Sequence, residues 1–307
     1  METALLAPEE KNWKIKIRKE ERNKDSLGKY KLDPKLCKIR EEAFSKLPKT
    51  EEEAREQNTP FFDGMSTCFI GEMNENAVNI EIMPIRYSYR LATIELSNKI
   101  STENLTKISP NIIQVAILIA YKREEDGKII FLSQLRGGKT VGTGKVLLQL
   151  AGGGLEEKHL SKKNPFFACL EDESSEEVGY TLKEFEKIKC LGFNEEKECG
   201  CIRLLYFKKL PTNKKEILEA FLKHCKKLEK EKKEGEVSAL IEFSLDEMLE
   251  KERISLENLL FKNHKIWEYD KATQTLSEKK KDLQFSHEGE ILFIQKYKEE
   301  VLKYFQE

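Results

Sequence analysis

The sequence predicts an α/β (α+β) fold in which helices cover both faces of a mixed sheet, a helix–sheet–helix sandwich. Two observations predict this class. Short runs of β-branched and aromatic residues, separated by turn-forming residues, recur from residue 59 onward. Capped or amphipathic helical patterns lie among the later strand-like runs, at 164–178, at 212–234 and at the C-terminus. Strands on both sides of a helix in the sequence favour a layered sandwich.

Composition limits the class of protein and its partners. The 307 residues are 36% charged and 39% hydrophobic, and the formal net charge is -1. A net charge near zero gives no general attraction to nucleic acid or to a membrane surface, so we expect neither partner. No apolar run reaches the roughly 20 residues of a membrane span. The first residues do not resemble a signal peptide, and the seven cysteines form no CxxC pair, which predicts a cytoplasmic protein.

The chain is predicted to have two parts. Residues 1–108 read as an N-terminal extension, helical over 1–58 and a small β-unit over 59–108. Residues 109–307 read as the main domain, with a helical insertion near 212–234 and a C-terminal helix.

Within the main domain the strand patterns are clear. Residues 111–136 predict a hairpin, because two β-branched runs flank Asp126-Gly127. Further strands are expected at 187–194, 201–210 and 236–243, and a short helix at 255–269. The glycine-rich loop after Arg136 lacks the order of a phosphate-binding P-loop.

The predicted helix at 164–178 ends in acidic residues. Asn164-Pro165 is a favourable helix start, and Gly179 is a favourable stop. Glu176 and Glu177 therefore fall in the last turn, where a negative charge costs about 0.3–1 kcal/mol against the helix dipole. Glu173 shares their face, which we expect to point away from the core, and like charges at this spacing repel. A bound Mg²⁺ or Mn²⁺ would turn that cost into affinity, whereas the alternative is a solvated surface. The opposite stripe, expected to pack on the sheet, is Phe167, Leu170, Ser174 and Val178.

The stretch "DESSEEVGY" (172–180) resembles the second half of the Nudix box, Arg-Glu-U-x-Glu-Glu-x-Gly-U, where U is a bulky aliphatic residue. Upstream, "LLQLAGGGLEE" is similar to the family's strand and Gly-Gly-x-x-Glu loop. "FLSQLR" is similar to the Gln-x-Arg strand of the ADP-ribose/ADP-sugar pyrophosphatase branch. The resemblance covers about residues 110–260. Three positions depart from the box: Asp172 replaces its arginine, Ser174 an aliphatic residue and Asn164 a glutamate.

The resemblance implies a Nudix-like fold and a Mg²⁺- or Mn²⁺-dependent hydrolase. Its substrate would be a small-molecule nucleoside diphosphate linked to another moiety, of the ADP-sugar, ADP-ribose or UDP-sugar type. The N-terminal region would be similar to an extra sheet that often mediates dimerisation in that branch, which suggests a homodimer. The implied metal ligands are Glu173, Glu176, Glu177 and Glu156. The implied catalytic residues are Glu173, Glu177 and Glu236, with Glu236 as a general base. The implied substrate-binding residues are Arg136, Gly152, Gly153 and Gly154.

Two alternatives remain open at this point. Arg136 binds a phosphate oxygen or forms a salt bridge at a strand end, and the base is Glu236 or the nearby Glu234. The departures Asp172 and Asn164 also fit a Nudix-fold protein that binds nucleotides, or serves as a scaffold, without catalysis. RNA-end processing finds little support, because no basic stripe with interleaved aromatic residues stands out.

Overall fold

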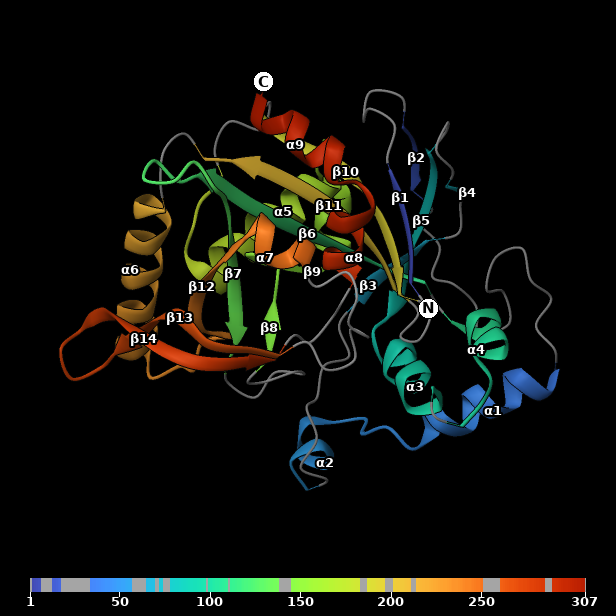
Figure 1. Ribbon diagram of the computed structural model, residues 1–307. Helices are drawn as coiled ribbons and strands as arrows, with labels where there is room; N and C mark the ends of the chain where they lie inside the picture. The colour runs from blue at the N-terminus through green and yellow to red at the C-terminus, as the bar shows by residue number, and fades with distance from the viewer. Residues whose placement is uncertain are drawn as a thin grey trace. The chain divides into compact units, whose positions relative to one another are not determined.

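Figure 1 shows the computed structural model as a ribbon. Its residues divide into two compact units. The first contains Met1–Val115, Gly153–Cys169 and Cys190–Leu204, and the second contains Ala116–Gly152, Leu170–Lys189 and Leu205–Glu307. Several elements have residues in both units. The structure describes residues 2–6, 13–17, 34–56, 65–69, 72–73, 78–97, 99–109, 111–137, 145–182, 187–196, 201–210, 214–250, 260–284 and 289–306.

The strands of the first unit form two groups of pairs. β1 (Glu2–Leu6) is antiparallel to β10 (Ile188–Glu196). β5 (Val78–Arg86) is antiparallel to β3 (Met65–Phe69) and β4 (Glu72–Met73) and parallel to β2 (Lys14–Ile17). Parallel and antiparallel pairs occur together, so the mixed sheet that the sequence predicts is confirmed.

The helices of the first unit are short. They are α1 (Pro34–Ser45), α2 (Glu51–Glu56), α3 (Ser88–Leu96), α4 (Thr102–Ile108) and the 3₁₀ turn η2 (Glu157–Ser161). Buried Ala43, Ala92, Leu96 and Leu105 form a small core beside α1, α3 and α4. The helical expectation for 1–58 is wrong for β1 and β2, because these residues pair with distant strands. The β-unit predicted at 59–108 also contains two helices.

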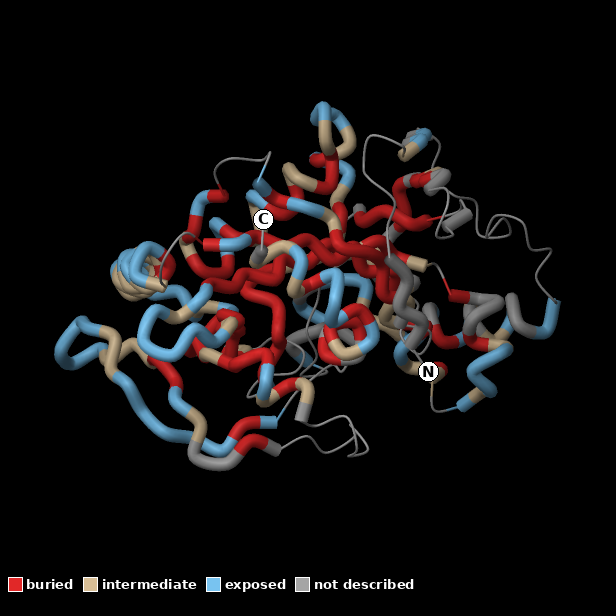
Figure 2. The backbone as a smooth tube through the Cα atoms, turned by 45° about the horizontal axis from the view of Figure 1, so that its top comes forward, coloured by how far each residue is buried: buried red, intermediate tan, exposed pale blue. Residues whose placement is uncertain are grey.

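The second unit is built on antiparallel strands. β6 (Ile112–Lys122) is followed across the sheet by β7 (Ile129–Arg136), β12 (Val237–Ser244), β13 (Leu260–Asp270) and β14 (Thr275–Gln284). The remaining strands are β8 (Val146–Leu147), β9 (Ala151–Gly154) and β11 (Cys201–Lys209). β6, β7 and β12 are buried along most of their length, whereas β14 is mostly exposed (Figure 2). The predicted hairpin of β6 and β7 is confirmed, and Gly127 takes the left-handed φ of +70° in its turn.

The helices of this unit are the end of α5 (Pro165–Val178), α6 (Lys215–Glu231), α7 (Leu245–Glu250), α8 (Gly289–Lys296) and α9 (Lys298–Gln306). α6 buries Ile217 and Phe221, and α9 places Tyr304 and Phe305 against Phe207 of β11. The predicted helices near 212–234 and at the C-terminus are confirmed. The short helix expected at 255–269 is wrong where the structure describes it: Leu260–Asp270 is a strand that pairs with β12 and β14.

Among the described residues, no helix is both long enough and apolar enough to cross a membrane.

Candidate functional site

The acidic helix α5 begins and ends where local chemistry requires. The Phe167 N–H donates to Asn164 Oδ1 at 3.1 Å, so Asn164 is the expected N-cap. At the other end Gly179 has φ +71°, and the Gly179 N–H donates to the Ser175 carbonyl at 3.1 Å. The Ser174 hydroxyl donates to the Tyr180 carbonyl at 2.7 Å. Glu177 is thereby fixed in the final turn, close to the stop.

Glu177 is buried, with only 3% of its side chain exposed, so the expectation that the acidic face points away from the core is wrong for this residue. Glu176 is exposed and Glu173 is half-buried. Glu177 lies three positions after Ser174 and one before Val178, both of which are buried as expected. Residues three apart share a helical face, so Glu177 borders the buried stripe rather than the solvent side.

The buried carboxylate of Glu177 receives hydrogen bonds from three groups. Oε1 accepts from Arg136 Nη1 at 2.7 Å. Oε2 accepts from Gln134 Nε2 at 3.1 Å and from the Gly152 N–H at 3.0 Å. Gln134 and Arg136 are two positions apart on β7 and therefore project from the same face of the strand. The side chains of β7 and the backbone of β9 together fix the orientation of this carboxylate.

Arg136 also meets a second carboxylate. Its side chain is 14% exposed, and Nη2 lies 3.3 Å from Oε2 of Glu236, which is 54% exposed. The Gly137 N–H donates to the Glu236 carbonyl at 2.7 Å, which holds the two segments together. A Cβ at Gly137 would lie 2.9 Å from Ser238 Cβ, so the close approach requires glycine. The salt bridge left open as an alternative for Arg136 is therefore present in the structure.

Burial raises the pKa of the Glu177 carboxyl to about 7. The charge of Arg136 and the hydrogen bonds from Gly152 and Gln134 act in the opposite direction, and the charge of Glu236 adds to the increase. Desolvation therefore outweighs the pairing. At neutral pH this carboxyl is divided between its charged and neutral forms.

The structure brings together Arg136, Gly152, Glu177 and Glu236 from the predicted site. Gly153, Gly154 and Glu156 belong to the first unit. There the Glu156 N–H donates to His159 Nδ1 at 3.1 Å, and the Glu156 carboxylate lies 3.5 Å from Lys158 Nζ. The Gly154 carbonyl accepts from Cys169 Sγ at 3.4 Å.

The predicted metal ligands do not form a metal centre in the described part of the chain. There, no three or more His, Cys, Asp or Glu side chains stand close enough together to hold an ion. Both oxygens of Glu177 already accept hydrogen bonds from the protein. The described side chains therefore show no divalent-cation site, and binding of Mg²⁺ or Mn²⁺ stays a prediction.

The Gln-x-Arg pattern contains both Gln134 and Arg136, but only Arg136 was predicted as a site residue, although the period-2 geometry of a strand places both on one face. It also missed a polar cluster in which Glu242 accepts from the Tyr121 hydroxyl and lies 2.7 Å from Lys214 Nζ. These groups come from β6, β12 and the start of α6, and no local sequence signal connects them.

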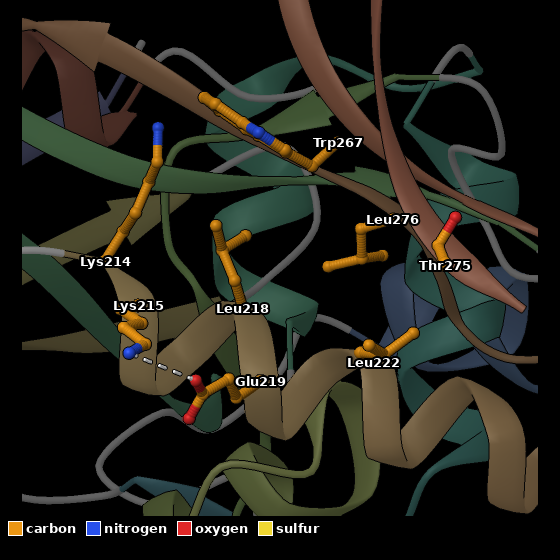
Figure 3. Close-up of a pocket in the computed structure, with 8 residues that line it drawn as sticks. All are labelled: Lys214, Lys215, Leu218, Glu219, Leu222, Trp267, Thr275 and Leu276. Carbon is orange, nitrogen blue, oxygen red and sulfur yellow. Dashed lines mark ion pairs between the residues drawn. The ribbon is translucent and has the colours of Figure 1, made fainter.

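A groove of about 500 Å³ lies between α6 and the β13–β14 hairpin (Figure 3). Leu218 and Leu222 of α6 line it together with Trp267 and Leu276 of the hairpin. Lys214 at its end lies 3.5 Å from the centre of the Trp267 ring and is also paired with Glu242. The walls are mainly apolar, and Lys214 and Lys215 are paired with Glu242 and Glu219.

Comparison with known proteins finds distant likeness alone. No protein-family model matches the sequence, and no curated protein matches it. A MutT/nudix family protein from Enterococcus faecalis is 13% identical, with a TM-score of 0.35 over 63% of this chain and 62% of that chain. The C. elegans Ap4A hydrolase is 15% identical, with a TM-score of 0.22 over 33% of this chain and 70% of that one. Its binary complex is 18% identical, with a TM-score of 0.21 over 33% and 68%.

The chain spans less than two thirds of the length of the Enterococcus protein. With TM-scores this low, the likenesses carry no argument about activity, and the Nudix resemblance continues to rest on the sequence motifs.

Proposed function

We propose that this protein hydrolyses the diphosphate bond of a nucleoside diphosphate linked to another moiety. The observation that supports the proposal is the meeting of Arg136, Gly152, Glu177 and Glu236 at one place. The sequence resemblance implies a binding or catalytic role for each of these residues. They come from β7, β9, α5 and the residue before β12, so the fold rather than the sequence order joins them.

In the proposed reaction a water oxygen attacks one phosphorus atom, and the bond from that phosphorus to the bridging oxygen breaks. The bridging oxygen leaves on the second phosphate, and the proton of the attacking water passes to a general base. Glu236 is our candidate base, because its carboxylate is 54% exposed and is held beside Arg136. A base must lie within hydrogen-bond reach of the attacking water, and the exposed Glu236 carboxylate is open to solvent water.

We also propose that the hydrolysis depends on Mg²⁺ or Mn²⁺. Divalent ions ordinarily neutralise a diphosphate and activate water in such reactions. The described side chains form no metal cluster, so this dependence is proposed from the sequence resemblance. The ADP-sugar, ADP-ribose or UDP-sugar class of substrate is likewise proposed from the sequence resemblance.

The test is a hydrolysis screen over nucleoside diphosphate sugars, dinucleotides and nucleoside triphosphates, each with Mg²⁺, with Mn²⁺ or with a chelator. We expect turnover of at least one nucleoside diphosphate derivative and its loss with the chelator. Wild-type protein that hydrolyses no compound with either metal would contradict the proposal.

The runner-up function is nucleotide binding, or a scaffold role, without catalysis. One observation favours it: protein groups donate to both oxygens of Glu177, which leaves that carboxylate engaged internally. Asp172 in place of the box arginine points the same way. Thermal denaturation with the same panel of compounds separates the two functions. A binding protein would be stabilised by a nucleotide that it does not hydrolyse.

A further inference from the structure

We infer that Arg136 is a positioning residue that holds Glu177 and Glu236 in place, and not a residue that binds the substrate phosphate. The inference rests on the proposed function, since the two carboxylates matter for catalysis only if the reaction takes place. It departs from the phosphate-binding role that the sequence resemblance implies for Arg136.

The first argument is burial. Glu177 is 3% exposed and Arg136 is 14% exposed, and their nearest atoms are 2.7 Å apart. Removing the cation from this buried pair is unfavourable, because Glu177 must then either stay charged out of water or take up a proton. Moving Arg136 onto a phosphate would leave Glu177 with only neutral donors, Gln134 and the Gly152 N–H.

The second argument is the geometry of the guanidinium group. Nη1 donates to Glu177, and Nη2 lies 3.3 Å from Glu236. Its planar, rigid fork sets the direction of both contacts at once, which the single point charge of a lysine does not do. Arg136 therefore links a buried carboxylate to an exposed one and fixes their separation.

The third argument is the identity of position 172. Asp172 precedes the three glutamates of α5, where the box pattern has an arginine. An aspartate offers no cation to Glu177. The cation beside Glu177 comes from β7, where Gln134 and Arg136 project from one face of the strand toward the last turn of α5.

The experiment compares Arg136→Lys and Arg136→Gln with Arg123→Lys as a matched control. Arg123 pairs with Asp126 at 2.6 Å in the β6–β7 turn, so its replacement removes the same kind of fork elsewhere. We expect Arg136→Lys to lower kcat by about 10- to 100-fold while KM changes little, as misplaced catalytic groups do. Arg136→Gln should lower kcat further, and Arg123→Lys should behave as wild type.

A second experiment measures how the Arg136–Glu177 pair affects thermal stability. Arg136→Gln should unfold at a lower temperature than the double variant Arg136→Gln/Glu177→Gln, because the double variant no longer buries a carboxyl that has lost its cation and must stay charged out of water or take up a proton. If Arg136→Gln does not fold, Arg136→Lys keeps the charge and carries the kinetic test.

The inference would be overturned if Arg136→Lys bound substrate about tenfold more weakly or worse, seen as a raised KM, while kcat stayed unchanged. Arg136 would then be a substrate-binding residue. An inactive wild-type protein would instead contradict the proposed function, and that result appears before any variant is made.

Discussion

The carboxylate of Glu177 lies in an electrostatically unfavourable place. It is buried in the last turn of a helix, where the helix dipole disfavours a negative charge. Its ion-pair partner, Arg136, also pairs with Glu236. Three hydrogen bonds, one of them charge-assisted, offset part of this cost. The part of the desolvation cost that these bonds do not offset raises the pKa of the Glu177 carboxyl to about 7.

This raised pKa gives a pH-dependence of stability with a definite sign. The ordinary value of the carboxyl is 4.5 and the folded value is about 7, so the folded protein binds this proton more tightly than the unfolded chain. The contribution to stability is fully present below pH 4.5 and is lost as the pH rises through 7. We expect Glu177→Gln to reduce the fall in the free energy of unfolding between about pH 5 and pH 8 by roughly 1–3 kcal/mol.

Urea denaturation at several pH values measures this slope. Glu171→Gln, at an exposed position on the same helix, is the control and should keep the wild-type slope. An unchanged slope in Glu177→Gln would show that the carboxyl titrates normally in the folded protein.

Which residues act together could be predicted only in part. Arg136, Gly152, Glu177 and Glu236 were named from motif positions, and they meet in the structure. The burial of Glu177 was not foreseen, because helical periodicity places position 177 at the edge between the acidic face and the buried stripe. Gln134 was missed as a partner, since its role depends on which strand faces the end of α5.

The end of α5 combines local and tertiary requirements at Gly179. Its φ of +71° favours glycine for local reasons. In addition, a Cβ there would lie 2.5 Å from His224 Cβ and 3.1 Å from the Ala220 carbonyl of α6. The sequence indicated the first requirement but not the second, because α6 lies some forty residues further along the chain.

Gly127 provides a matched control for this position. It has nearly the same φ, +70°, but a Cβ there would meet only Lys122 Cε, at 3.7 Å. We expect Gly127→Ala to cost about 1–2 kcal/mol through backbone strain. Gly179→Ala should cost roughly 1–3 kcal/mol more, because α6 must move away. Equal losses in thermal or urea denaturation would mean that α6 does not press on the end of α5.

Elements with strong local signals were predicted well, and those that depend on distant partners were not. The β6–β7 hairpin, α5 with its caps, α6 and the strand β12 follow from turn residues, caps and periodicity. β13 was expected as a helix, and its strand conformation comes from pairing with β12 and β14. β1 and β2 pair with β10 and β5, which lie far along the chain, and no local pattern signals such pairing.

The mixed α+β class follows from the order of the elements, and the structure confirms it. The prediction divides the chain once, at residue 108. In the structure each compact unit instead contains segments from several parts of the sequence. Such interleaving arises when neighbouring strands come from distant segments, and composition along the chain does not reveal it. The homodimer through the N-terminal region and the cytoplasmic location stay predictions.

The central claim is that the meeting point of Arg136, Gly152, Glu177 and Glu236 is a catalytic site. Steady-state hydrolysis of the best substrate from the panel by Glu177→Gln, beside wild type and Glu171→Gln, tests it most directly. We predict that Glu177→Gln loses about 100-fold or more in kcat/KM, because the amide no longer pairs with Arg136 and the groups of the site are misplaced. Glu171→Gln should retain wild-type activity, and both variants should unfold cooperatively. A folded Glu177→Gln protein that hydrolyses the substrate at the wild-type rate would contradict the claim.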